Sequence, residues 1–168
     1  MESQTQRKPR ILCLHGFRTS GEILRNWQED CPKPCSKSHE DFTEYTNFEE
    51  CLAYMEDYML KHGPFDGVLG FSMGGMIAAL LPAMQEQGLA LTKLAANAFS
   101  SPINCPSLHF IGEKDFNRQD GTTLLESFVD PVVIHHTKGH TIPKLDEKAE
   151  ETMVKFIEQI QMVPLHEE

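Results

Sequence analysis

The sequence predicts an α/β fold in which helices flank a mostly parallel sheet. Short apolar runs alternate along the chain with longer segments whose apolar residues recur at helical spacing. Strands that alternate with helices pair in parallel, and the helices then cover the faces of the sheet. The chain has 168 residues, of which 40% are hydrophobic, so it suits one domain over residues 1–168 with a core of its own.

The first half of the chain predicts two strands and three helices. In chain order these are a strand, two helices, a strand and a helix, at residues 10–14, 21–28, 48–62, 65–71 and 74–87. Asn47 is a good N-cap for the second helix, and Gly63, followed by a proline, ends it. A polar stretch with two prolines at residues 28–41 predicts a loop. Pro82 predicts a kink in the third helix.

The second half predicts two more strands and two more helices. In chain order these are a strand, a helix, a strand and a helix, at residues 107–111, 122–128, 132–136 and 149–160. The last helix is amphipathic, because its larger apolar residues, Met153, Phe156, Ile157 and Ile160, fall in one register. Each strand of this half runs into a polar loop, and these two loops carry candidate functional residues.

The sharpest chemical signal is Gly70-Phe71-Ser72-Met73-Gly74, a G-x-S-x-G pattern between a predicted strand and a predicted helix. In this context the pattern predicts a nucleophile elbow, a strained turn at the end of the strand. The glycines let the backbone turn without a clash, and the helix that follows points its N-terminal amides toward the site. We therefore predict that Ser72 is a nucleophile that attacks an ester carbonyl. The structural alternative is an ordinary turn in which Ser72 caps the helix.

A serine hydroxyl is a weak nucleophile and needs a base, which in folds with such an elbow follows in the order Ser, acid, His. We predict His140 as the base, because it lies on the loop just after the last predicted strand. The other histidines after Ser72 fit less well. His109 lies inside a predicted strand, His135 and His136 are strand neighbours that face opposite ways, and His166 is in the C-terminal tail.

We predict Asp115 as the acid that holds the His140 tautomer and stabilises the imidazolium, because Asp115 closes the loop after the strand at residues 107–111. Glu113 is the near competitor and Asp120 the more distant one. The structural alternative is a turn aspartate that bonds its own backbone.

The segment His15-Gly16-Phe17 ends the first predicted strand and resembles a loop that supplies one amide of an oxyanion hole. We predict the backbone N–H groups of Phe17 and Met73 as the two donors. The side chains at these positions matter little to this role, because the donor is the backbone.

Composition excludes several other classes of function. The formal net charge of −10 argues against nucleic-acid binding and against an anionic membrane surface. The longest apolar stretch, residues 76–84, is far shorter than the roughly 20 residues of a membrane span. With no export signal, five cysteines are most simply reduced thiols in a cytoplasmic protein, with a nuclear location also open. The sequence makes no prediction of oligomeric state.

No cofactor or metal is predicted. Cys31, Cys35 and His39 have a spacing found in zinc sites, but a fourth ligand is not apparent, so we favour a loop with free thiols. The chain contains neither of the glycine-rich patterns that cradle phosphates.

Four segments together resemble the family serine hydrolases, a group of small α/β hydrolases that includes the ovarian-cancer-associated esterase. They are Ile11 to Gly21, Phe65 to Ser72, Leu108 to Asp115 and Gly139 to Pro143, which match the family's opening, elbow, acid strand and histidine loop. The resemblance covers most of the chain. It implies an α/β-hydrolase fold and hydrolysis of small or acyl-chain esters by a carboxylesterase mechanism, without a cofactor.

Two strands that the resemblance implies are missing from this chain. One would precede the helix at residues 48–62, and the other would lie between the elbow strand and the acid strand, where residues 89–105 contain few β-branched residues. Losing the second would move the later strands inward by one strand spacing, roughly 4.8 Å. Either residues 91–99 supply a substitute strand, or Ser72 is misaligned with its partners. The alternative function is therefore a catalytically silent variant that binds a ligand or a partner.

Overall fold

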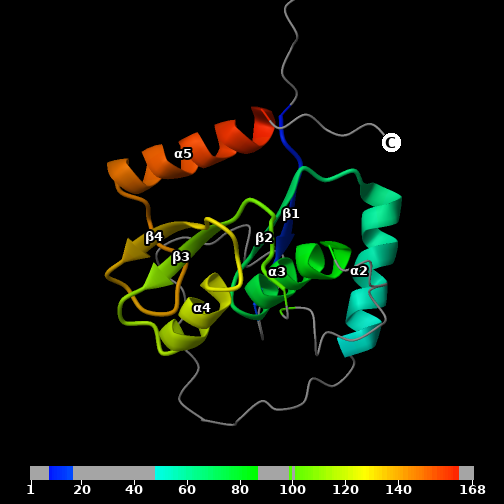
Figure 1. Ribbon diagram of the computed structural model, residues 1–168, viewed down its shortest axis with the longest axis horizontal. Coiled ribbons are helices and arrows are strands. Elements are labelled where there is room, and N and C mark those ends of the chain that lie inside the picture. The colour runs from blue at the N-terminus through cyan, green and yellow to red at the C-terminus, as the bar shows by residue number, and fades with distance from the viewer. Residues whose placement is uncertain (1–7, 17–47, 87–98, 100, 163–168) are drawn as a thin grey trace, which may run out of the picture.

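The computed structural model describes residues 8–16, 48–86, 99 and 101–162 (Figure 1). In chain order its elements are β1 (Ile11–Leu14), α2 (Phe48–His62), β2 (Gly67–Gly70), α3 (Met73–Glu86), β3 (Leu108–Gly112), α4 (Arg118–Leu125), β4 (Val132–His136) and α5 (Glu147–Met162). Helices alternate with parallel strands, so the fold is α/β, as the sequence predicts. The helix expected at residues 21–28 and the loop after it lie outside the described residues.

The described strands form two separate parallel pairs. In one pair β1 lies beside β2, with Ile11 opposite Gly67. In the other β3 lies beside β4, with Leu108 opposite Val132. Within the described ranges, β2 and β3 are not hydrogen-bonded to each other. The inward shift of one strand spacing is therefore not observed. The sequence allows a substitute strand at residues 91–99, of which residues 91–98 lie outside the described part of the chain.

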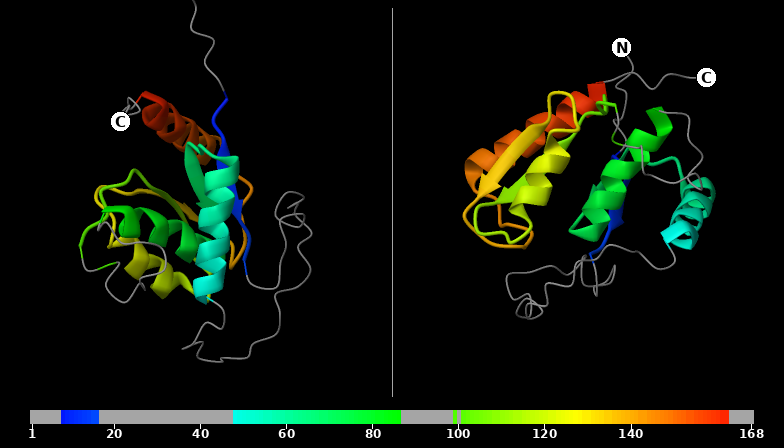
Figure 2. Two further views of the ribbon diagram at one scale, coloured as in Figure 1. Left: turned by 90° about the vertical axis from the view of Figure 1, so that its right-hand side faces the viewer. Right: turned by 60° about the horizontal axis from the view of Figure 1, so that its bottom comes forward.

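The helices pack against the strand pairs and against one another. Helix α3 contacts β1 and β2, α4 contacts β3, and α5 contacts β4. Helices α3 and α4 lie side by side on one face of the strands (Figure 2). No described helix has the length and apolar character that crossing a membrane requires.

One hydrophobic core lies between helices α2 and α3 and the segments that precede β3 and β4. Its buried members come from α2, from α3 and from an isolated bridge between two loop residues: Leu52, Ala79, Leu80, Ala83, Met84, Ile103 and Phe128. The bridge pairs Ile103 with the segment around Phe128, because the Ile103 N–H donates to Ser127 O at 2.8 Å and the Val129 N–H donates to Ile103 O at 2.9 Å. The core thus packs α2 and α3 against the segments that precede β3 and β4.

Helix α4 begins four residues before the start that the sequence predicts. Gly121, which lowers helix propensity, lies within it. A Cβ at this position would come within 3.3 Å of Cδ1 of Ile111 on β3, so the glycine lets the helix approach the strand. Pro82 lies inside α3 as expected. Helix α4 thus includes a glycine that propensity disfavours, at a position close to β3.

Candidate active site

Ser72 occupies a strained turn between β2 and α3. Its φ angle is 56°, in the left-handed region that non-glycine residues rarely adopt. A Cβ on Gly70 would lie 2.1 Å from the carbonyl oxygen of Gly74, and a Cβ on Gly74 would lie 2.3 Å from the carbonyl oxygen of Leu14. Both contacts are with backbone, which cannot move aside. Glycine is therefore required two residues before and two residues after the serine.

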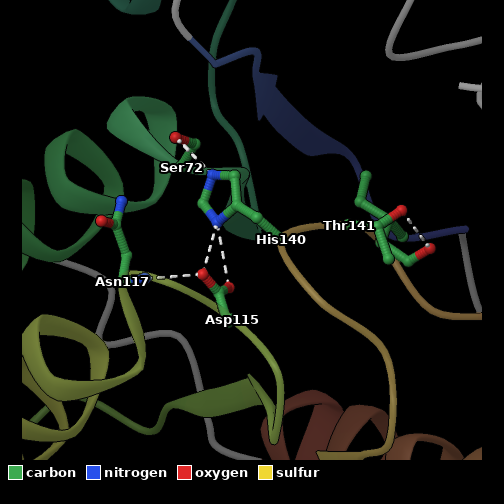
Figure 3. A network of polar contacts seen from close by, with 6 residues as sticks. Ser72, Asp115, Asn117, His140 and Thr141 are labelled. Atoms are coloured by element: carbon green, nitrogen blue, oxygen red, sulfur yellow. Dashed lines mark hydrogen bonds and ion pairs between the residues drawn. The ribbon is translucent and has the colours of Figure 1, made fainter. Parts of the chain in front are cut away.

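The structure brings Ser72, Asp115 and His140 together (Figure 3). Nε2 of His140 lies 2.9 Å from Oγ of Ser72. Nδ1 of the same ring lies 3.0 Å and 2.9 Å from the two carboxylate oxygens of Asp115. The three side chains follow the ends of β2, β3 and β4. With a proton on Nδ1, facing the carboxylate, Nε2 is free to accept the hydroxyl proton of Ser72.

The loop that carries Asp115 is fixed by backbone hydrogen bonds. The Asn117 N–H donates to Oδ1 of Asp115 at 2.8 Å, which sets the direction of the carboxylate (Figure 3). Beyond the strand ends, the Lys114 N–H donates to Lys138 O at 3.1 Å. This bond connects the loop that carries Asp115 to the loop that carries His140. The side chains of Asp115 and His140 are only 18% and 19% exposed, which limits competition from water for their hydrogen bond.

The other candidate histidines and acids lie elsewhere. Burial lowers the pKa of His109, whose Nε2 lies 3.1 Å from Oγ of Ser107 within the second strand pair. His135 is exposed, as are the two competing acids Glu113 and Asp120. His166 lies outside the described residues.

His136 is a neighbour of the site that sequence reasoning did not single out. Burial lowers its pKa, the charges of Asp115 and Glu113 act in the opposite direction, and His135 lowers the pKa further. Its buried Nδ1 has no hydrogen-bond partner among the described residues. Burial thus disfavours the charged form of this ring, which interacts electrostatically with Asp115.

The predicted oxyanion donors are only partly described. Phe17 lies outside the described residues, whereas Met73 is the first residue of α3. The loop after β1 reaches Ser72, because a Cβ on the buried Gly16 would lie 3.1 Å from Cβ of Ser72. The N-terminus of α3 and the end of β1 thus both lie beside the hydroxyl.

Two aromatic rings that the sequence reasoning did not consider lie against the His140 ring. The centroid of the Phe71 ring is 5.0 Å away and that of Phe116 is 4.7 Å away. A signal was present in the sequence, because Phe71 immediately precedes Ser72 and Phe116 immediately follows Asp115.

Among the described residues, no group of three or more His, Cys, Asp or Glu side chains is placed to hold a metal ion. Cys31, Cys35 and His39, the partial zinc pattern, lie outside the described ranges.

The family model "Serine hydrolase (FSH1)" matches residues 33–99 and 91–152. Together these segments cover well over half of the chain. The chain belongs to the FSH1 serine hydrolase family. The two matched segments of this FSH1 hydrolase overlap at residues 91–99, between α3 and β3.

Relatives of this FSH1 chain include proteins named as esterases. Esterase OVCA2 of Xenopus tropicalis is 35% identical over 98 residues, which cover 48% of this chain and 43% of the relative. Esterase OVCA2 of Bos taurus is 30% identical over 139 residues, covering 71% and 61%. Esterase FPY3 of Fusarium mangiferae is 26% identical over 210 residues, covering 90% and 96%. The chain thus spans 43% and 61% of the two OVCA2 proteins, and the third alignment is longer than the chain itself.

Proposed function

We propose that this FSH1 hydrolase cleaves small-molecule carboxylic esters through an acyl-enzyme on Ser72. The observation that carries the proposal is the line of hydrogen bonds from Oγ of Ser72 through the His140 ring to the Asp115 carboxylate. An isolated serine hydroxyl reacts slowly at neutral pH, and a base held at 2.9 Å by an oriented acid removes that limit. The names of the relatives as esterases support an ester as the substrate.

The reaction runs in two halves. Oγ of Ser72 attacks the ester carbonyl carbon while Nε2 of His140 takes the hydroxyl proton, and Asp115 stabilises the resulting imidazolium. The tetrahedral intermediate collapses to the acyl-enzyme as the imidazolium gives that proton to the leaving alcohol. Water, deprotonated by His140, then attacks the acyl carbonyl. Collapse of the second intermediate releases the carboxylic acid and returns the proton to Ser72.

The carbonyl oxygen becomes negative in each intermediate and needs donors. We assign this role to the backbone N–H groups of Met73 and Phe17. Met73 is at the N-terminus of α3, where unpaired amides and the helix dipole favour negative charge. For Phe17 the support is its position directly after Gly16, which lies against Ser72.

The alternative is a catalytically silent variant that binds a ligand or a partner. One observation favours it. The alignment with the Fusarium esterase is longer than this chain, so that relative has residues with no counterpart here. We infer that these residues include the two strands expected from the family resemblance. Their loss would weaken the framework that carries the site, whatever the distances between the side chains.

Labelling with a fluorophosphonate probe separates the two functions, because such a probe reacts quickly only with an activated serine. We expect the folded protein to be labelled and to hydrolyse an activated short-chain ester. Ser72→Ala should lose both, with at least about a thousandfold lower turnover. Ser107→Ala is the matched control, since Ser107 also lies beside a histidine ring, at 3.1 Å from Nε2 of His109. A folded protein that is neither labelled nor active would support the silent variant.

A further inference from the structure

The two phenylalanines beside His140 differ in how they are held. Phe71 is partly buried within the elbow, whereas the Phe116 side chain is 75% exposed. An apolar ring this exposed gains little from the hydrophobic effect at its position. Its centroid nevertheless lies 4.7 Å from that of the His140 ring, with the planes tilted by 45°. Core packing therefore does not account for where Phe116 lies.

The face of a phenylalanine ring is electron-rich and attracts a cation within about 6 Å of its centroid. His140 is neutral when it awaits the Ser72 proton and carries a positive charge in each tetrahedral intermediate. The Phe116 ring is within that range, with its centroid 4.7 Å from that of His140 and a tilt that leaves part of its face directed toward the imidazole, so we expect it to favour the charged imidazolium over the neutral form. An interaction that is stronger in the intermediate than in the resting state accelerates the reaction.

We propose that Phe116, together with Phe71, is a positioning residue that stabilises the imidazolium form of His140 during catalysis. This inference rests on the proposed function, since it assigns His140 the role of base. The rings add to the larger effect of Asp115, whose carboxylate faces Nδ1 at 2.9 Å. A further ionisable neighbour is His136, whose ring interacts electrostatically with Asp115, Glu113 and His135.

The primary variant is Phe116→Leu, which keeps an apolar side chain and removes the aromatic face. We expect kcat for an activated ester to fall about two- to fivefold while KM stays unchanged, because the imidazolium forms only during the reaction. The acidic limb of the pH–rate profile should move to lower pH by about half a unit, since the charged ring is less favoured. A purely structural loss would lower the rate without moving that limb.

Two further variants serve as controls. Phe116→Trp restores a stronger aromatic face and should recover or exceed the wild-type rate. Tyr54→Leu removes a ring of similar exposure, 68%, on α2 and should change neither the rate nor the profile. Wild-type kinetics in Phe116→Leu, or failure of Phe116→Trp to rescue, would overturn the proposal.

An activity-independent readout keeps this inference distinct from the proposed function. The ring signals of His140 can be followed by NMR against pH and assigned by their disappearance in His140→Gln. We expect their midpoint in Phe116→Leu to lie at lower pH than in the wild type. If the wild type hydrolyses no ester, the proposed function fails while this titration still decides whether Phe116 favours the charged ring. Identical midpoints would contradict the inference, whatever the activity.

Discussion

The two strand pairs hold their functional side chains by different means. In the β1–β2 pair Ser72 is fixed by backbone sterics, because the turn at φ 56° leaves no room for a Cβ at Gly70 or Gly74. In the β3–β4 pair Asp115 and His140 are fixed by hydrogen bonds that continue the ladder beyond the strand ends. Steric exclusion around the turn thus fixes the position of Ser72, whereas hydrogen bonds fix the positions of Asp115 and His140. The first arrangement is intolerant of added volume, and the second is intolerant of lost polar groups.

The contact between the pairs has a third origin. The hydrogen bond from Ser72 to His140 crosses from one pair to the other, yet among the described strands no ladder joins β2 to β3. Among the described residues, the core around Leu52, Met84 and Ile103 packs α2 and α3 against the segment that precedes β3. Catalytic distances tolerate errors of only about 0.5 Å. Alignment of the site should therefore depend on packing at residues that touch none of its side chains.

The largest effect is expected from the polar partner in the second pair. Asp115→Asn replaces the carboxylate that faces Nδ1 of His140 with an amide, which favours the wrong tautomer. We expect kcat to fall about 10⁴-fold with little change in folding, measured by ester turnover and circular dichroism. Glu113→Gln, at the exposed competitor two residues earlier, should stay within about twofold of the wild type. A larger loss of kcat in Glu113→Gln would mean that Glu113, and not Asp115, is the acid.

Added volume tests the first pair. Gly74→Ala would force a Cβ to within 2.3 Å of the Leu14 carbonyl oxygen, so the end of β1 or the start of α3 must shift. We expect a loss of about 3 kcal/mol in unfolding free energy, with loss of probe labelling. Gly75→Ala is the matched control, because its Cβ would meet nothing closer than 3.4 Å. Denaturant unfolding of both variants checks the difference, and equal stability would show that the close approach is not required.

Core packing tests the contact between the pairs. Ile103→Ala removes a core side chain that is 1% exposed and that contacts the same cluster as α2 and α3, and Ile134→Ala removes one that is 6% exposed within β4. Each should cost about 2–5 kcal/mol of unfolding free energy. Only Ile103→Ala should also slow labelling of Ser72 at a temperature where both variants remain folded. Equal labelling rates would mean that the core does not set the alignment.

The smallest predicted effect is a loss of folding stability at acidic pH, and it arises in the second strand pair. Burial lowers the pKa of His109 on β3 and of His136 on β4 below the ordinary value of 6.5. The unfolded chain then binds protons more readily than the folded one. Stability should be complete above about pH 6.5 and should decline as the pH falls through the lowered values. Urea unfolding across this range measures it, and His109→Gln should flatten the decline.

Several features of this protein could be predicted from sequence because they are local. The strands at β1, β2, β3 and β4 follow from short apolar runs, and the elbow follows from two glycines around Ser72. The positions of Asp115 and His140 at strand ends, which the structure brings together with Ser72, follow from the same pattern. Local apolar patterns and backbone sterics involve only a few neighbouring residues, so they predict these features without knowledge of the tertiary fold.

Other features were decided only by contacts between distant residues. The sequence suggested that a lost strand would draw the later strands inward, whereas the described strands form two separate pairs. Helix α4 includes Gly121, which lies close to Ile111 on β3, and the rings of Phe71 and Phe116 meet His140 from separate loops. The sequence by itself determined which side chains are candidates for the proposed ester hydrolysis. Only the tertiary structure decided how they are aligned, because alignment is set by packing between segments that the chain holds far apart.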